Sequence, residues 1–107
     1  MSTISTHVLD TSQGKPAAGV RVEFEREDGR TIGAVTDANG RVANFETGDV
    51  TPGTYRLRFD TAEYFTKTNR PVFYPEVVVS FRIEAGDEHF HIPLLVSPFG
   101  YSTYRGS

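Results

Sequence analysis

Three histidines and one arginine are the side chains of this sequence best suited to acid–base chemistry. His89 and His91 lie two residues apart near the C-terminus, His7 lies near the N-terminus, and Arg41 follows an Asn-Gly turn. An imidazole has a reference pKa of about 6.5, so it can take up and release protons near neutral pH. A guanidinium stays charged and can stabilise an oxyanion. The chain has no cysteine, which excludes a thiolate nucleophile, disulfides and thiolate metal sites.

The C-terminus carries the other groups that could do chemistry. Residues 101–107 read Tyr-Ser-Thr-Tyr-Arg-Gly-Ser and follow an apolar segment directly. Chain ends are usually small and polar and pack against nothing, but this one carries two tyrosines and lies next to Phe99. We therefore expect the terminus to be tied down, so that it can deliver a hydroxyl, a guanidinium and a carboxylate to one fixed point.

Apolar residues at every second position predict that strands must position these groups. Residues 20–25, 55–60 and 77–84 alternate in this way, as strands do when one face is buried and the other is wet. Asp-Gly and Asn-Gly pairs between such segments favour hairpin turns. Residues 60–67 instead have a capping aspartate, an early acid and a late base, which predict one short helix. The predicted fold is an all-β, antiparallel Greek-key sandwich of seven to eight strands with that helix.

The same alternation predicts the direction of the imidazoles. Residues 90, 92 and 94 are apolar and must face the core, so His91 on the alternate face points outward. The equivalent argument for residues 4, 6 and 8 turns His7 outward. Isolated outward histidines are usually solvated, but Leu9, Pro93 and Leu95 make these faces too apolar for plain solvent. We therefore predict an interface here.

A metal site is the alternative use of the histidine pair. His89 and His91 share one face, and His7 or a carboxylate could supply the third protein ligand that zinc requires. A His-x-His pair alone is a weak signal, so we expect no metal. Arg41 likewise has a simpler interpretation, as a solvated arginine at the start of a hairpin strand.

Composition limits the partners and the compartment. A net charge of −3 gives no support for a nucleic-acid or anionic-membrane partner. No apolar run approaches the roughly 20 residues of a membrane span, and residues 1–7 lack the basic and apolar parts of a secretory signal. We expect a single domain over residues 1–107, located in the cytoplasm.

Four segments together resemble one known family. They are residues 7–11 (His-Val-Leu-Asp-Thr), 36–41 (Thr-Asp-Ala-Asn-Gly-Arg), 73–76 (Phe-Tyr-Pro-Glu) and 91–107, which ends in Tyr-Arg-Gly-Ser. Over its whole length the chain resembles the 5-hydroxyisourate hydrolases, the transthyretin-related enzymes of urate breakdown. The terminal Tyr-Arg-Gly-Ser is the most specific part of the resemblance.

The resemblance implies a fold, an assembly and a reaction. The fold is a transthyretin-like sandwich, and the assembly is a homotetramer, a dimer of dimers, with active sites in a cleft between subunits. The reaction is cyclic amide hydrolysis, in which 5-hydroxyisourate becomes 2-oxo-4-hydroxy-4-carboxy-5-ureidoimidazoline without a cofactor. A transthyretin-like small-molecule carrier and a structural Greek-key module remain as alternatives, because this fold alone does not decide function.

The resemblance also implies which residues do the work. The expected catalytic residues are His7, Arg41, His91 and Ser107. The expected substrate-binding residues are His7, Arg41, Tyr104, Arg105, Gly106 and Ser107. The two histidines share the acid and base roles in an order that the sequence leaves open. Arg105 either faces the site or anchors the terminus through a salt bridge, and His89 is interpreted as peripheral.

Overall fold

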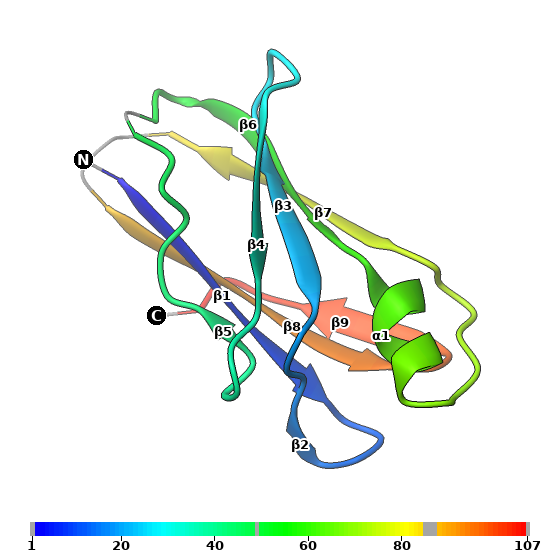
Figure 1. The fold of residues 1–107 in the computed structure, drawn as a ribbon. Helices are drawn as coiled ribbons and strands as arrows, with labels where there is room; N and C mark the ends of the chain where they lie inside the picture. Colours follow the sequence, from blue (N-terminus) through cyan, green and yellow to red (C-terminus); the bar gives the residue numbers. More distant parts are fainter. Residues whose placement is uncertain (1, 49, 85–87, 107) are drawn as a thin grey trace.

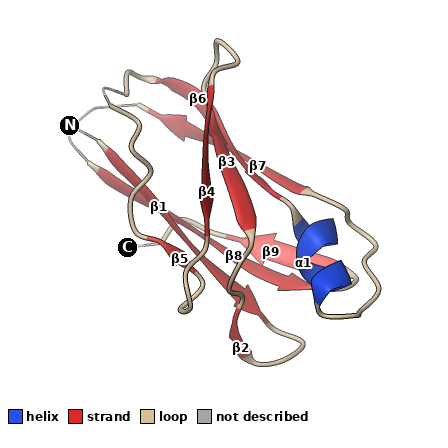
Figure 2. Ribbon diagram, viewed as in Figure 1, coloured by secondary structure: helices blue, strands red, loops and turns tan. Residues whose placement is uncertain are grey.

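The computed structural model describes residues 2–48, 50–84 and 88–106, which form two β-sheets and a short helix (Figure 1). The elements follow the chain in the order β1 (Thr3–Asp10), β2 (Lys15–Pro16), β3 (Arg21–Glu25), β4 (Thr31–Val35), β5 (Arg41–Val42), β6 (Gly53–Phe59), α1 (Thr61–Lys67), β7 (Val77–Ile83), β8 (His89–Ser97) and β9 (Gly100–Thr103). Figure 2 shows the dominance of strands and the helix at the end of β6. The predicted all-β fold with one short helix is confirmed.

The strands from the two ends of the chain, β1, β8 and β9, all lie in one of the two sheets. One has the order β2-β1-β8-β9, with β5 also paired to β1, and the other has the order β4-β3-β6-β7. Among the described strands, every pair is antiparallel except β1 with β8. These two strands come from opposite ends of the chain and need no tight turn between them, so parallel pairing is open to them. Their register sets Ser5 beside His91 and His7 beside Pro93.

The core lies between the two sheets and consists of the residues that alternation turns inward. Phe24, Leu57 and Phe59 from one sheet, and Ile4 and Leu94 from the other, are fully buried. Burying a side chain of this size stabilises the fold by about 1.5–3 kcal/mol. The inward faces of β1 and β8 therefore fix these strands, which leaves their outward faces for a site.

Local capping explains why α1 forms where the sequence predicts it. The Asp60 carboxylate accepts a hydrogen bond from the backbone N–H of Glu63 at 3.0 Å. Glu63 lies in the first turn and Lys67 in the last, which suits the helix dipole. Tyr64 and Phe65 are buried and hold the helix against the sandwich.

A buried carboxylate joins the end of β1 to the segment after α1. Asp10 is fully buried and accepts hydrogen bonds from Tyr64 (2.7 Å), Ser12 (2.6 Å) and Arg70 (2.5 Å). Burial alone would raise the pKa of Asp10, but these hydrogen bonds and the charge of Arg70 outweigh it and lower the pKa from 3.8 to about 2. Arg70 also lies over the ring of Phe65, 4.8 Å from its centroid. This network fastens the helix to the sheet that carries the histidines.

Candidate active site

Three neighbouring strands bring Arg41, His7 and His91 onto one surface. Arg41 in β5 is the register partner of His7 in β1, and Ser5 in β1 is the register partner of His91 in β8. Ser5 and His7 are two residues apart in one strand, so they point to the same face. The two imidazoles, both half-buried, and the exposed Arg41 therefore share one outward face of the sheet.

The C-terminal segment is tied to β8 beside His91. Leu94 in β8 pairs with Thr103 in β9, and the Thr103 hydroxyl donates to the Pro93 carbonyl at 2.7 Å. Beyond β9 the backbone N–H of Gly106 donates to the His91 carbonyl at 2.8 Å. The expected fixed terminus is therefore present up to residue 106, and backbone pairing holds it.

Gly106 lies so close to His91 that a side chain would not fit. A Cβ atom at residue 106 would lie 2.5 Å from Cδ2 and 3.2 Å from Cγ of the His91 ring. Real carbon atoms do not approach so closely. Gly106 therefore lets the terminus pass directly beside the imidazole, which explains a glycine between two polar residues at the end of the chain.

Two hydroxyls and two imidazoles form a continuous hydrogen-bonded row on this outward face of the sheet. Ser5 Oγ lies 2.7 Å from His91 Nδ1 and 2.9 Å from His89 Nε2. Thr3 Oγ1 lies 2.5 Å from His89 Nδ1. The interpretation of His89 as peripheral is too simple, because its ring reaches His91 through Ser5. Sequence reasoning missed Thr3 and Ser5 because the parallel register that sets them beside the histidines has no local signal.

Burial and nearby positive charge act on His91. Burial lowers its pKa below the ordinary value of 6.5, and the charges of Arg41, His89 and His7 lower it further. Among the described residues, none is hydrogen-bonded to the imidazole of His7, to Nε2 of His91 or to the guanidinium of Arg41. The site thus offers three polar groups that are free to contact a ligand. One of them, the His91 imidazole, is neutral near neutral pH.

Arg41 and His91 border an open hollow of about 430 Å³, whereas His7 lies on the same face of the sheet but does not line the hollow. Its lining is formed by Ser5, Thr6, Arg41, Val42, Ala43, His89 and His91. Tyr104 and Arg105 instead line a separate hollow of about 310 Å³, which His91 also borders. His91 therefore stands between the two hollows, and the structure does not bring Tyr104 and Arg105 to the same side as Arg41.

The remaining predicted residues of the terminus have different surroundings. The Tyr104 side chain is exposed. The Arg105 guanidinium contacts Glu88 at 3.4 Å and lies over the ring of Phe90, 5.0 Å from its centroid. Of the two interpretations of Arg105, the described contacts match the anchoring one. Ser107 lies outside the described residues.

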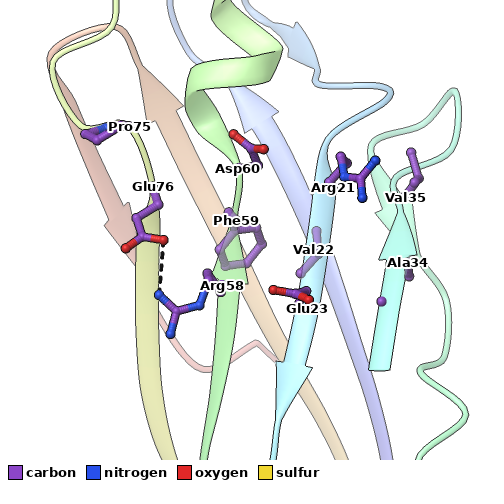
Figure 3. A pocket seen from close by; sticks show the side chains of 11 residues that line it. Arg21, Val22, Glu23, Ala34, Val35, Arg58, Phe59, Asp60, Pro75 and Glu76 are labelled. Carbon is purple, nitrogen blue, oxygen red and sulfur yellow. Dashed lines mark hydrogen bonds and ion pairs between the residues drawn. The ribbon is translucent and has the colours of Figure 1, made fainter. Parts of the chain in front are cut away.

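A larger hollow of about 600 Å³ lies on the other sheet (Figure 3). Its charged lining comes from Arg21, Glu23, Arg58, Asp60 and Glu76, and Arg58 forms an ion pair with Glu76 at 3.0 Å. Figure 3 shows cations and anions mixed along the strands, with no histidine among the lining residues. Size alone would favour this hollow, but no histidine lines it, so it is the weaker candidate for acid–base catalysis.

Within the described residues, no group of three His, Cys, Asp or Glu side chains is arranged to hold a metal ion. The metal interpretation of His89 and His91 therefore lacks its third ligand there. In the same part of the chain, no helix has the length and apolarity needed to cross a membrane.

The fold and the site together indicate the class of protein to which the chain belongs. A model of the HIUase/Transthyretin family matches residues 4–106, and the chain belongs to this family. The transthyretin-like sandwich predicted from the sequence is thereby confirmed.

Within the family, the chain can be compared with particular proteins. It is 45% identical to a 5-hydroxyisourate hydrolase from Caulobacter vibrioides, over all of both chains. A solved 5-hydroxyisourate hydrolase from Klebsiella pneumoniae is 43% identical, with a TM-score of 0.90 over 98% of this chain and 99% of that one. Sea bream transthyretin, solved in complex with thyroxine, is 32% identical, with a TM-score of 0.86 over 96% of this chain and 93% of that one. The chain is thus similar to 5-hydroxyisourate hydrolases and to a transthyretin with the same fold.

Proposed function

We propose that this protein hydrolyses 5-hydroxyisourate to 2-oxo-4-hydroxy-4-carboxy-5-ureidoimidazoline in urate degradation. Relatives with this name match the chain over its full length at about 45% identity. The observation that carries the proposal is the shared face of His7, Arg41 and His91, where three polar groups have no hydrogen-bond partner among the described residues. The proposal assigns the activity to one domain over residues 1–107. The cytoplasmic location predicted from the sequence stays a prediction.

The reaction requires three tasks from the site. Water adds to a ring amide carbonyl, a tetrahedral oxyanion forms, and the C–N bond breaks as the leaving nitrogen takes a proton. His91 suits the role of general base, because its lowered pKa keeps the imidazole neutral at neutral pH. His7 would then protonate the leaving nitrogen. Neither step needs a cofactor.

The remaining tasks fall to the arginine and the terminus. Arg41 is exposed at the edge of the hollow, where its fixed charge can stabilise the oxyanion. Gly106 lets the terminus approach His91, which supports the proposed catalytic role of Ser107, the next residue in the sequence. Tyr104 and Arg105 keep their proposed contact with substrate only if a neighbouring subunit closes the site.

A homotetramer with sites between subunits completes the proposal. Strands β7 and β9 are edge strands of their sheets, and Phe99, Tyr101 and Tyr104 expose large aromatic surfaces near β9. Exposed edges and aromatic patches are typical of surfaces that pair with another chain. Leu9 and Leu95 are half-buried apolar residues on the same outward face as His7 and His91, and they support the same interpretation.

Carriage of a small molecule is the second candidate, because sea bream transthyretin shares the fold. A carrier has no need of an imidazole with a lowered pKa beside a free guanidinium, so the site favours the hydrolase.

The test is the decay of freshly made 5-hydroxyisourate, followed by its ultraviolet absorbance. The proposal predicts decay that is faster with the protein than in buffer and proportional to protein concentration. Decay at the buffer rate, with stoichiometric binding of a small aromatic ligand, would favour the carrier instead.

A further inference from the structure

The hydroxyl of Ser5 is the link between two histidine rings. It lies 2.7 Å from His91 Nδ1 and 2.9 Å from His89 Nε2, and Thr3 Oγ1 in turn contacts His89 Nδ1. Ser5 is only 6% exposed, whereas His89 is exposed. The row therefore runs from the half-buried His91 out to the surface.

A hydroxyl has one proton, so Ser5 can donate to only one ring and must accept from the other. If Ser5 donates to His91, neutral His91 carries its proton on Nε2, and this nitrogen cannot act as a base. If Ser5 accepts from His91, the proton is on Nδ1 and Nε2 has a free lone pair. Ser5 then donates to His89 Nε2, and His89 donates from Nδ1 to Thr3.

The surroundings of His91 favour the second direction. Its Cδ2 edge packs against Gly106, Nδ1 faces Ser5, and no described residue is hydrogen-bonded to Nε2. With the Nδ1 proton held by Ser5, Nε2 can take a proton from the attacking water and later release it while the row stays unchanged. In the first direction, all the hydrogen bonds of the row would have to reverse in every turnover.

We propose that Ser5, backed by His89, is a positioning residue that holds His91 in the Nδ1–H tautomer and so frees Nε2 as the general base. Its role in turnover rests on the proposed hydrolase function, whereas the tautomer itself is a property of the folded protein. The inference adds Ser5 and His89 to the residues on which the rate depends, although neither contacts the reacting atoms.

The test combines nuclear magnetic resonance with kinetics. Two-bond proton–nitrogen spectra of the ¹⁵N-labelled protein at about pH 8, where imidazoles are neutral, should show the Nδ1–H tautomer for both His91 and His89. In Ser5→Ala, His91 should become a mixture of tautomers. Its kcat should fall roughly 10- to 100-fold while KM stays within about threefold, because only the proton transfer is impaired. Ser5→Thr, which keeps the hydroxyl, should recover most of the rate.

The chain offers a matched control in Ser2→Ala. The Ser2 hydroxyl is also buried, but it has no hydrogen-bond partner among the residues that the structure describes, so its removal breaks no bond there. This variant should keep both the tautomer and kcat. If Ser5→Ala fails to fold, the exposed His89→Ala carries the same test, with a smaller loss of kcat and the same loss of tautomer order at His91.

Two results would overturn the inference: a wild-type His91 with its proton on Nε2, or an unchanged His91 tautomer in both Ser5→Ala and His89→Ala. A wild type that shows the Nδ1–H tautomer but no turnover would instead contradict the proposed function and leave the assignment of the tautomer intact.

Discussion

At the scale of single residues, the site depends on how tightly the His91 ring is held. Ser5 fixes Nδ1, Gly106 packs against the Cδ2 edge, and the backbone of His91 pairs with that of Gly106. Arg41 approaches from β5 and adds a positive charge. An imidazole fixed on several sides loses little entropy on reaching the transition state, which is where positioning contributes most to rate.

The pH dependence of activity should follow His91. Its pKa lies below 6.5, so activity should stay high as the pH falls to 6.5 and decline only as the pH falls through the lowered pKa, where the base becomes protonated. Arg41→Gln removes a positive charge and should raise the pKa of His91 toward its ordinary value. It should also lower kcat by roughly 100- to 1,000-fold. Titration of the His91 ring by nuclear magnetic resonance checks the shift, with Arg21→Gln on the other sheet as the control. A His91 pKa that does not rise in Arg41→Gln would contradict the electrostatic account.

Gly106→Ala tests the close approach of the terminus. The new Cβ would lie 2.5 Å from His91 Cδ2, so either the ring or the terminus must move. A displacement of about 1 Å in a catalytic group can cost about 100-fold in rate, so we expect kcat to fall at least tenfold with the fold intact. Gly33→Ala is the matched control, because nothing lies within 4 Å of its Cβ position and its φ is ordinary. Equal activity in the two variants would show that the approach has no role in catalysis.

At the scale of elements, the site depends on the strands and on the contacts that fasten them. The parallel pair β1–β8 holds the histidines, and β5 brings Arg41 to β1. The network around Asp10 lies at the far end of β1 and connects it to the segment after α1. Substitutions in this network should therefore change the stability of the fold without directly changing the catalytic groups.

Asp10 should make stability depend on pH below about pH 4. Its pKa is lowered to about 2 in the folded state from 3.8, so it stabilises the fold above pH 3.8 and loses that contribution as the pH falls toward 2. The contribution amounts to about 2 kcal/mol. Asp10→Asn should lower the free energy of unfolding at pH 7 by roughly 3 kcal/mol, because Arg70 loses its charge partner, and should flatten the pH dependence in acid. Urea unfolding at several pH values measures both.

The control for this prediction is Asp28→Asn, which removes an exposed carboxylate paired with Arg30. Exposed pairs contribute little, so its stability should be close to that of the wild type. Equal losses in Asp10→Asn and Asp28→Asn would show that burial of the pair does not matter.

The strands and the helix could be predicted from the sequence, but the contacts between distant strands could not. Alternation identified the strands and turned His7 and His91 outward, and capping residues placed α1 correctly, because these signals are local. The register of β1 on β8 joins residues more than 80 positions apart, and no local pattern encodes it. For this reason the sequence does not predict that Thr3 and Ser5 contact His89 and His91. The contact of Arg105 with Glu88 depends instead on the pairing of the terminus with β8, which also has no local signal.

At the scale of the whole molecule, the account depends on a second copy of the chain. Tyr101 in edge strand β9 is 45% exposed and lies against Tyr74, with 5.3 Å between their ring centroids. Such aromatic surface beside an unpaired edge is costly to leave in water. The hollow lined by Arg41 and His91 is open in the isolated chain, so a second copy that covered it would exclude water from it.

Tyr101→Glu should therefore weaken assembly without unfolding the chain. Sedimentation should give a tetramer for the wild type and smaller species for the variant, together with a loss of activity of at least tenfold if the sites lie between subunits. Val35→Glu changes another exposed apolar residue on the edge strand β4 and should remain a tetramer. A wild type that is a monomer at assay concentrations would contradict the shared site.

The rate of 5-hydroxyisourate decay with His91→Asn, relative to wild type at the same protein concentration, tests the central claim most directly. Asparagine can still contact Ser5 but cannot exchange a proton near neutral pH. The account predicts a fall in kcat of roughly 100-fold or more, with an unchanged fold and assembly. A variant that retains activity within about threefold of wild type would contradict the assignment of His91 as the base.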